Sequence, residues 1–360
     1  MLSIEMLSAF VLSIVFISLI IKYAQPLRLI DIPNGRSSHK KPIPKGAGIG
    51  FVVAALMTAF LCNSDLMLQN ILAVAAVCIV LGTGVLDDIF DLAPKMKLLA
   101  ILIAVVMIYF DGFAITDLGN YMGYEIILPW LLVLPFTYVS VVGFSNALNL
   151  IDGIDGLAGG VSMVILITLL AIGIKFDDTF IVLISASFAL ALAAFMLFNW
   201  YPAKIFMGDS GSLTLGFVIA MLFIKSLEYI NPTVVLFITA IPLLDTLSVI
   251  RRRLQRKQSI VKADKNHLHH ILLSQKQDVR FTAQMLIMMQ FVYSVIGYRL
   301  IGQGDSWNII VFAVLFLIYF NLFDPRRRKR QKKKQSEAHH LHAAMREDDY
   351  ESSTSVQKSI

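Results

Sequence analysis

The stretch NALNLIDGIDG, residues 146–156, lies between two long apolar blocks at 126–145 and 157–174. Its two amides and two acids recur at every third residue: Asn146, Asn149, Asp152 and Asp155. On a helix or in a tight turn, this spacing brings neighbouring side chains onto one face. Such polar groups beside hydrocarbon cost free energy unless a cation, a ligand or water satisfies them. The stretch therefore predicts a polar site between two membrane spans.

The composition of the whole chain points to a membrane protein. Of its 360 residues, 57% are hydrophobic and only 16% are charged, whereas a soluble domain carries about 25% charged residues. The apolar residues form about eleven blocks, several of them near the roughly 20 residues of a membrane span. The blocks lie near 2–21, 47–62, 68–86, 98–112, 126–145, 157–174, 179–198, 211–228, 232–250, 282–301 and 307–323. We predict an all-α, polytopic integral membrane protein with about 11 transmembrane helices.

The distribution of basic residues predicts the orientation of these spans. The first block lacks the basic start of a signal peptide and carries Glu5 instead, so we expect a retained helix whose N-terminus is outside the cytoplasm. An odd number of spans then leaves the C-terminus inside. Of the 31 Lys and Arg residues, 28 fall in segments that this assignment places inside. These segments are 22–47, 87–97, 199–210, 251–281 and 324–360. The polar motifs fall on the same side, which predicts a site at the cytoplasmic face.

The last residues differ in composition from the rest. We predict a membrane-embedded domain over 1–323 and a cytoplasmic tail over 324–360. The tail begins with RRRKRQKKK at 326–334, which we expect to bind the anionic headgroups of membrane lipid. Nucleic acid is the weaker interpretation of that basic run, and we expect no nucleic-acid partner. The remainder of the tail is polar, and we expect it to be disordered.

A second acidic cluster ends the third apolar block, in the string GVLDDIFDL. Asp87 and Asp91 share a helical face, and so do Asp88 and Asp91. Carboxylates this close repel one another unless they meet a cation, which implies a divalent metal ion or a raised carboxylate pKa. Lys95 and Lys97 follow, and acids beside bases suit a site for Mg²⁺ and phosphate together. The alternative is a solvated helix end.

Two further motifs carry chemistry. In FNWYPAKIFMGDSGSLTLGF, at 198–217, Asp209 is either an N-cap or a metal-binding carboxylate beside a glycine-rich phosphate cradle. The loop 251–281 holds Arg251, Arg252, Arg253, Arg256 and Lys257, and then DKNHLHH. Its histidines admit structural zinc, although no cysteine is near, or a solvated basic loop. A positive rim that orients an anionic sugar nucleotide is the interpretation we favour.

Four strings occur together and in order: DDIFD, NALNLIDGIDGLAGG, FMGDSGSLTLG and HLHH. With them, residues 1–323 resemble the polyprenyl-phosphate N-acetylhexosamine-1-phosphate transferase superfamily, glycosyltransferase family 4. The histidine string is similar to the WecA-type branch, which uses UDP-N-acetylglucosamine. Leu268 interrupts the histidines and no acid follows His270, unlike the pattern of the peptidoglycan branch.

The resemblance implies an activity. It implies transfer of GlcNAc-1-phosphate from UDP-GlcNAc to undecaprenyl phosphate, giving undecaprenyl-diphospho-GlcNAc and UMP, with Mg²⁺ or Mn²⁺ as cofactor. It implies a bacterial cytoplasmic (inner) membrane and the first membrane step of a cell-surface polysaccharide of the O antigen, enterobacterial common antigen or teichoic acid type. The same chemistry with another UDP-N-acetylhexosamine or with UDP-MurNAc-pentapeptide is the alternative.

The resemblance also implies roles for individual residues. Metal ligands are implied at Asn149 and Asp209. Catalytic roles are implied at Asp87, Asp88, Asp152 and Asp155. For substrate binding we take Asn146, Lys97, Arg253, His267, His269, His270, Gly153 and Gly156, the two glycines because they let backbone approach a bulky ligand.

Several alternatives stay open at this stage. Asp87 or Asp88 takes any residual proton during direct attack of the lipid phosphate, or an aspartyl-phosphate forms first. A secondary transporter is a remote alternative, although its acids would lie near the bilayer midplane. A homodimer is also left open, because apolar span faces suit lipid and a partner helix equally.

Overall fold

The computed structural model describes residues 4–33, 41–255, 268–273 and 278–323. The chain divides into two compact units, Met1–Ala313 and Val314–Ile360, which are described separately. In the second unit the described residues are the last part of one helix. The predicted tail lies outside the described residues, so the domain boundary at residue 323 stays a prediction.

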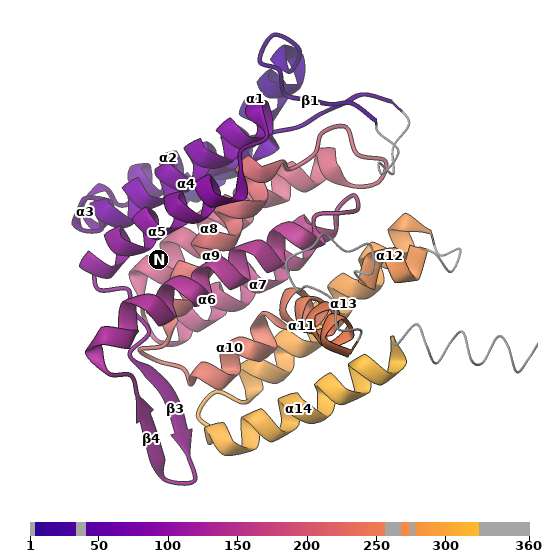
Figure 1. The fold of residues 1–360 in the computed structure, drawn as a ribbon. Helices are drawn as coiled ribbons and strands as arrows, with labels where there is room; N and C mark the ends of the chain where they lie inside the picture. The colour runs from indigo at the N-terminus through magenta and orange to yellow at the C-terminus, as the bar shows by residue number, and fades with distance from the viewer. Residues whose placement is uncertain (1–3, 34–40, 256–267, 274–277, 324–360) are drawn as a thin grey trace, which may run out of the picture. The chain divides into compact units, whose positions relative to one another are not determined.

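Helices make up most of the described chain (Figure 1). In chain order they are α1 (Leu7–Tyr23, after a 3-10 turn at Ile4–Met6), α2 (Ala47–Cys62), α3 (Ser64–Gln69), α4 (Ile71–Phe90), α5 (Pro94–Phe110), α6 (Trp130–Ile151), α7 (Leu157–Lys175), α8 (Thr179–Asn199), α9 (Asp209–Ser226), α10 (Pro232–Ile238), α11 (Ala240–Gln255), α12 (Leu268–Leu273), α13 (Val279–Arg299) and α14 (Asp305–Leu322). The strands of the described residues are β1 (Ile30–Asp31), β2 (Ile43–Pro44), β3 (Asp117–Tyr121) and β4 (Tyr124–Ile127).

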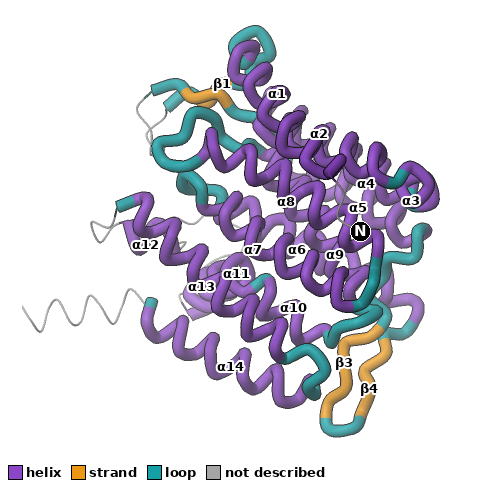
Figure 2. The backbone as a smooth tube through the Cα atoms, turned by 180° about the vertical axis from the view of Figure 1, so that it is seen from behind, coloured by secondary structure: helices purple, strands orange, loops and turns teal. Residues whose placement is uncertain are grey.

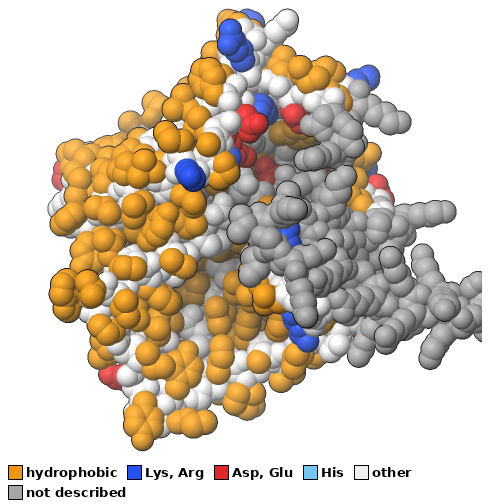
Figure 3. All heavy atoms as spheres, viewed as in Figure 1, with side chains coloured by type: hydrophobic (Ala, Val, Ile, Leu, Met, Phe, Trp, Pro, Cys, Tyr) orange, Lys and Arg blue, Asp and Glu red, His pale blue; other side chains and the backbone are white. Residues whose placement is uncertain are grey.

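Every apolar block of the sequence contains a helix. Within the described residues, 8 helices are long and apolar enough to cross a membrane, or 9 if the bent pair of α10 and α11 is one span. The predicted count of 11 is therefore not confirmed, because α2 has only 16 residues and α5 only 17. Hydrophobic side chains are the commonest on the left part of the face shown in Figure 3. Large apolar side chains that point outward, such as Trp130 and Leu197, suit contact with lipid. The protein is a multi-pass membrane protein.

Helix α9 is the most deeply enclosed of these helices, with 89% of its apolar window buried. It packs against α2, α4 and α6. Glycines permit this close packing: a Cβ at Gly84 of α4 would lie 2.5 Å from Cα of Ser210, and a Cβ at Gly216 would lie 2.7 Å from Cα of Ser145. Close backbone approach therefore fixes the start of α9 against the end of α4.

Two short antiparallel sheets interrupt the helical pattern, which the all-α prediction did not include. Strands β1 and β2 pair Ile30 with Pro44 and Asp31 with Ile43. Strands β3 and β4 form a hairpin that extends beyond the ends of α5 and α6 (Figure 2). Each strand has at most 5 residues, so neither produces the long alternation that reveals a strand in a sequence.

The block at 232–250 is not one straight helix. It breaks between Ile238 and Ala240, and α10 and α11 meet there at 89°. Pro242 lies in the first turn of α11, where a missing N–H is tolerated. The bend gives α11 a direction of its own, and that helix carries the arginines of the predicted substrate loop.

Candidate active site

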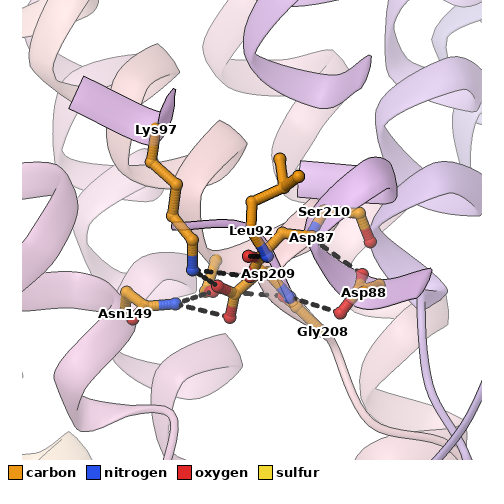
Figure 4. A network of polar contacts seen from close by, with 9 residues as sticks. Asp87, Asp88, Leu92, Lys97, Asn149, Gly208, Asp209 and Ser210 are labelled. Carbon is orange, nitrogen blue, oxygen red and sulfur yellow. Dashed lines mark hydrogen bonds and ion pairs between the residues drawn. The ribbon is translucent and has the colours of Figure 1, made fainter. Parts of the chain in front are cut away.

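Helices α4, α5 and α9 bring an ammonium group between two carboxylates. Lys97, near the start of α5, places its Nζ 2.5 Å from Oδ2 of Asp87 and 2.6 Å from Oδ2 of Asp209. Asp87 lies in the last turn of α4, and Asp209 is the first residue of α9 (Figure 4). One positive charge therefore serves two carboxylates in a partly enclosed setting, and acidic side chains gather in the hollow visible in Figure 3.

Asn149 reaches the same carboxylate from the last turn of α6. Its Nδ2 donates to Oδ1 of Asp209 over 3.0 Å and to Oγ of Ser212 over 2.7 Å. The two oxygens of Asp209 therefore face different helices, one toward α5 and the other toward α6. The structure thus brings both predicted metal ligands into direct contact.

Asp88 faces the backbone of α9. Its Oδ1 accepts from N–H of Asp209 and its Oδ2 from N–H of Ser210, both over 3.0 Å. Gly208, with φ of +74°, leaves the space for this carboxylate, because a Cβ there would lie 2.6 Å from Oδ2 of Asp88. The side chain of Asp209 caps nothing, so the N-cap interpretation is wrong and Asp88 supplies the cap. These first amides are therefore occupied by a carboxylate and do not form an open phosphate cradle. We use the name Asp209 cluster for Asp87, Asp88, Lys97, Asn149 and Asp209.

The end of α4 explains why Asp91 is not part of this group. Asp91 has φ of +53° and ends the helix, and its side chain is exposed. Leu92 N–H then donates to Oδ1 of Asp87 over 2.8 Å. The chain has left the helix by this point, so the predicted shared face of Asp87 and Asp91 does not form.

Asp152 follows α6 directly and is half-buried. Burial raises the pKa of its carboxyl group to about 7. The negative charges of Asp209, Asp88 and Asp155 raise it in the same direction. Lys97 therefore does not neutralise all of the negative charge in this region. A bound cation would favour the ionised form of Asp152 and lower its pKa.

Asp155 and Gly156 make hydrogen bonds with the last residue of α8 and with the segment that follows it. Asp155 accepts from N–H of Ala203 over 2.9 Å, and Gly156 N–H donates to Oδ1 of Asn199 over 3.0 Å. Gly156 has φ of +76°, and a Cβ there would meet the Trp200 ring at 2.9 Å. These contacts fix the path of the turn that leads into α7.

Two predicted residues of the same stretch lie apart from these contacts. The side chain of Asn146 is exposed on α6, and Gly153 is exposed in the turn. Within the described residues, no hydrogen bond joins Asn146 to the Asp209 cluster. The three-residue spacing therefore placed Asn149 correctly beside Asp209 but did not bring Asn146 with it.

The predicted substrate rim is only partly described. Arg253 lies in the last turn of α11 and is buried. His267 lies outside the described residues, and so do the side chains of His269 and His270, whose backbone forms part of α12. The zinc alternative and the substrate-rim interpretation both stay predictions.

Asp245 was missed by the sequence interpretation. It is 2% exposed on α11, and its Oδ1 accepts from N–H of Leu268 over 2.8 Å. This contact ties the start of the histidine helix α12 to α11. A lone acid within the apolar block 232–250 was the available signal, because ionisable groups inside spans are rare and usually functional.

The residues of the Asp209 cluster suit one kind of metal ion. Within the described residues, no three His, Cys, Asp or Glu side chains converge to hold a metal by themselves. Mg²⁺ binds through one or two carboxylates, retains water and takes oxygens from substrate phosphates. Asp209 offers a carboxylate, and the Asn149 amide can turn over to present its oxygen. This donor set fits Mg²⁺ or Mn²⁺ better than a closed zinc site.

An apolar groove of about 460 Å³ extends along α6 between Phe136 and Ala147. Helices α6, α9, α10 and α11 line it, with side chains that include Phe144, Ala147, Leu243 and Leu247. Ala147 lies two residues before Asn149, so the groove runs along α6 toward the charged site. None of the Asp209 cluster residues lines the groove, and its α9 wall begins at Ala220. A polar site near the end of one wall of an apolar groove fits an amphiphilic ligand.

A multi-pass helical bundle with an acid–lysine–amide site at the ends of its helices is typical of membrane-embedded enzymes that bind anionic substrates. A family model described as "Glycosyl transferase family 4" matches residues 70–227. A Bacillus subtilis protein called probable undecaprenyl-phosphate N-acetylglucosaminyl 1-phosphate transferase is 30% identical over 88% of this chain and 90% of its own. The undecaprenyl-phosphate alpha-N-acetylglucosaminyl 1-phosphate transferases of Yersinia pestis and Salmonella typhi are each 31% identical, over 88% and 89% of this chain and 90% and 89% of their own. The chain belongs to glycosyl transferase family 4, as the sequence strings predicted.

Proposed function

We propose that this protein transfers N-acetylglucosamine 1-phosphate from UDP-GlcNAc to undecaprenyl phosphate, which yields undecaprenyl-diphospho-GlcNAc and UMP. The names of relatives that align over most of the chain support this activity. The structural observation that carries it is the Lys97 ammonium group between Asp87 and Asp209, together with an apolar groove whose α6 wall ends at Ala147, two residues before Asn149. A charged site near the end of one wall of an apolar groove suits a phosphate on a lipid tail.

The groove supports a polyprenyl acceptor in particular. Its lining is apolar along α10 and α11, with Leu243 and Leu247 on the latter. A polyprenyl chain in this groove would gain about 25 cal/mol for each square ångström of apolar surface removed from water. Its phosphate would then lie toward the end of α6, where Lys97 and Asn149 meet Asp209.

The metal ion is part of the proposal. Asp209 and Asn149 would hold Mg²⁺ or Mn²⁺, with Asp87 close by on the other side of Lys97. When bound, the ion supplies positive charge that neutralises the diphosphate and orients it for in-line displacement. Lys97 supplies a second positive charge and can shift from its carboxylate partners to a phosphate oxygen.

The transfer itself needs little activation of the nucleophile. A phosphate monoester has its second pKa near about 6, so the lipid phosphate is mostly dianionic at neutral pH. One of its oxygens attacks the β-phosphorus of UDP-GlcNAc, a new P–O bond forms, and the bond to the α-phosphate oxygen breaks as UMP leaves. Asp87 accepts the proton from any lipid phosphate that is still protonated. Asp88 holds the start of α9, because both of its oxygens accept backbone hydrogen bonds.

Direct attack and a covalent aspartyl-phosphate differ in what remains on the protein. With UDP-GlcNAc labelled at the β-phosphate and no lipid acceptor, direct attack leaves the protein unlabelled. Label that stays on denatured protein would establish the two-step route. An Asp87→Asn variant that still becomes labelled would exclude Asp87 as the nucleophile.

The donor is tested by measuring UMP release from purified protein in detergent. Undecaprenyl phosphate, Mg²⁺ and one donor at a time are supplied. We expect rapid release with UDP-GlcNAc and much slower release with other UDP-N-acetylhexosamines or UDP-MurNAc-pentapeptide. No release of UMP with UDP-GlcNAc would contradict the proposal. Release only with another donor would show that the protein catalyses the same reaction with that donor. Turnover without a closed vesicle also argues against a transporter.

We place the site at the inner face of a bacterial cytoplasmic membrane, with the N-terminus outside and the C-terminus inside. The concentration of Lys and Arg in segments on that side supports this orientation. The product would enter a cell-surface polysaccharide such as an O antigen, enterobacterial common antigen or teichoic acid. Single cysteines introduced into 113–116 and 200–204 should react with an impermeant reagent from opposite sides of the membrane.

A further inference from the structure

The break between α10 and α11 leaves backbone groups without helical partners inside the bundle. The two helices meet at 89°, and Ile238 C=O and Ile241 N–H lie on either side of the break. Helix ends carry unpaired amides and carbonyls, and within a membrane no bulk water satisfies them. A sharp bend here therefore needs a partner from elsewhere in the fold.

Gln290 of α13 provides that partner. Its side chain is completely buried. Its Oε1 accepts from N–H of Ile241 over 3.0 Å, and its Nε2 donates to C=O of Ile238 over 2.7 Å. Nε2 also donates to Oγ of Ser294 over 2.9 Å. One side-chain amide thus joins both sides of the break in the way that a peptide group would.

Helix α13, which carries Gln290, packs closely against α10. A Cβ added at Gly297 would lie 2.8 Å from Cβ of Phe237, so α13 and α10 pack closely near the break. The groove is lined from both arms of the bend, by Val235 and Leu236 on α10 and by Leu243 and Leu247 on α11. The angle at the break therefore sets the distance between two walls of the groove.

We propose that Gln290 is a positioning residue that fixes the angle between α10 and α11 and so shapes the groove for the long chain of the lipid acceptor. This role rests on the proposed function. Gln290 does not line the groove and lies outside the Asp209 cluster, so it acts on the reaction only through the bent pair. The expected consequence is a selective effect on the acceptor.

The test compares two acceptors of different length in a Gln290→Leu variant, which keeps a similar volume and removes the amide. We expect KM for undecaprenyl phosphate to rise about tenfold, as the loss of buried hydrogen bonds predicts. KM for farnesyl phosphate, whose short tail reaches less of the groove, and KM for UDP-GlcNAc should change less than about twofold. Gln290→Glu, which when protonated can make both contacts, should restore most of the affinity for the long acceptor.

Ser294→Ala is the matched control, because it removes only the third contact of the Gln290 amide and should leave both acceptor KM values unchanged. Equal changes for both acceptors, or none in Gln290→Leu, would overturn the positioning role. If that variant does not fold, the shorter Gln290→Asn carries the same comparison. Binding of undecaprenyl phosphate, followed by native mass spectrometry, separates the two claims. Wild-type protein that binds the lipid but releases no UMP contradicts the proposed function, whereas selective loss of lipid binding in Gln290→Leu still supports the positioning role.

Discussion

Two groups of hydrogen-bonded side chains, each built on a carboxylate, lie near opposite ends of α9, a helix of 18 residues that is about 27 Å long. At one end is the Asp209 cluster. At the other, Asp305 at the start of α14 is 1% exposed and accepts hydrogen bonds from Thr233 Oγ1, Asn231 Nδ2 and the Asn120 amide. We use the name Asp305 cluster for Asn120, Asn231, Thr233 and Asp305. Its donors are all neutral, and they come from the β3–β4 hairpin and the start of α10.

The two clusters use carboxylates differently. In the Asp305 cluster both oxygens of one acid accept hydrogen bonds from neutral donors, and the acid thereby joins three elements of the fold. In the Asp209 cluster, Asp87 and Asp209 share the single ammonium group of Lys97, and the pKa of the nearby Asp152 is raised to about 7 by burial and by neighbouring negative charge. Surplus negative charge is typical of a site that binds a cation and phosphates. An acid whose two oxygens are both held by neutral donors is instead a structural clamp, that is, a contact that joins elements of the fold.

The largest effect is expected from removing the shared cation. Lys97→Met should lower kcat/KM for UMP release by about a hundredfold or more, because two carboxylates then face the phosphates without their counter-ion. Lys225→Met is the matched control, since Lys225 pairs with Glu228 near the far end of α9. Activity of Lys97→Met within about threefold of wild type would remove Lys97 from the transfer site.

Breaking the structural clamp should affect stability instead. Asp305→Asn turns an acceptor into a donor that faces other donors, and we expect the free energy of unfolding to fall by about 2 kcal/mol. Turnover of the folded protein should stay within about twofold of wild type. Thermal melting and UMP release on one preparation check both values, with the exposed Asp117→Asn in the same hairpin as control. Loss of turnover in Asp305→Asn without loss of stability would contradict the structural role of the Asp305 cluster.

An intermediate effect is expected at Asp88, which resembles the clamp although it lies in the Asp209 cluster. Asp88→Asn retains one acceptor for the two amides at the start of α9. We expect kcat to fall about tenfold through displacement of Asp209, together with a lower melting temperature. The exposed Asp91→Asn, three residues further on, should change neither quantity. A fall in kcat with an unchanged melting temperature would point to direct participation in the chemistry.

The smallest effect concerns pH. Asp152 holds its proton up to about pH 7 in the folded protein, whereas in the unfolded chain it ionises near about pH 4. Between these values only the unfolded state gives up the proton, so stability falls as the pH rises through this window and then levels off. The metal-free protein should therefore melt at a lower temperature near about pH 8 than near about pH 5. Asp152→Asn should reduce that difference, and an unchanged difference would contradict the assignment.

Much of this arrangement could be predicted from sequence. Apolar blocks located the helices because lipid contact and burial both demand uninterrupted hydrocarbon. Three acidic or amide motifs at block ends predicted that Asp87, Asn149 and Asp209 would lie in one site, and the structure brings them together. The roles of these residues stay predictions until variants are measured.

Other features depend on contacts between residues far apart in the sequence, which no local sequence pattern predicts. The hairpin contact of Asn120 with Asp305 spans 185 positions, and strands this short give no clear periodicity. The cap that Asp88 provides depends on α4 approaching α9 closely at Gly84. Gln290 and Asp245 did leave a signal, because each is a polar residue within an apolar block, but their partners could not be inferred from spacing.

The central claim, that the Asp209 cluster is the cation site and the Asp305 cluster is not, can be tested by electron paramagnetic resonance of Mn²⁺ added to the purified protein. The account predicts that wild-type protein binds Mn²⁺ in competition with Mg²⁺ and that Asp209→Asn weakens binding by about tenfold or more. Asp305→Asn should bind Mn²⁺ as wild type does. Unchanged binding in Asp209→Asn, or loss of binding in Asp305→Asn, would contradict the claim.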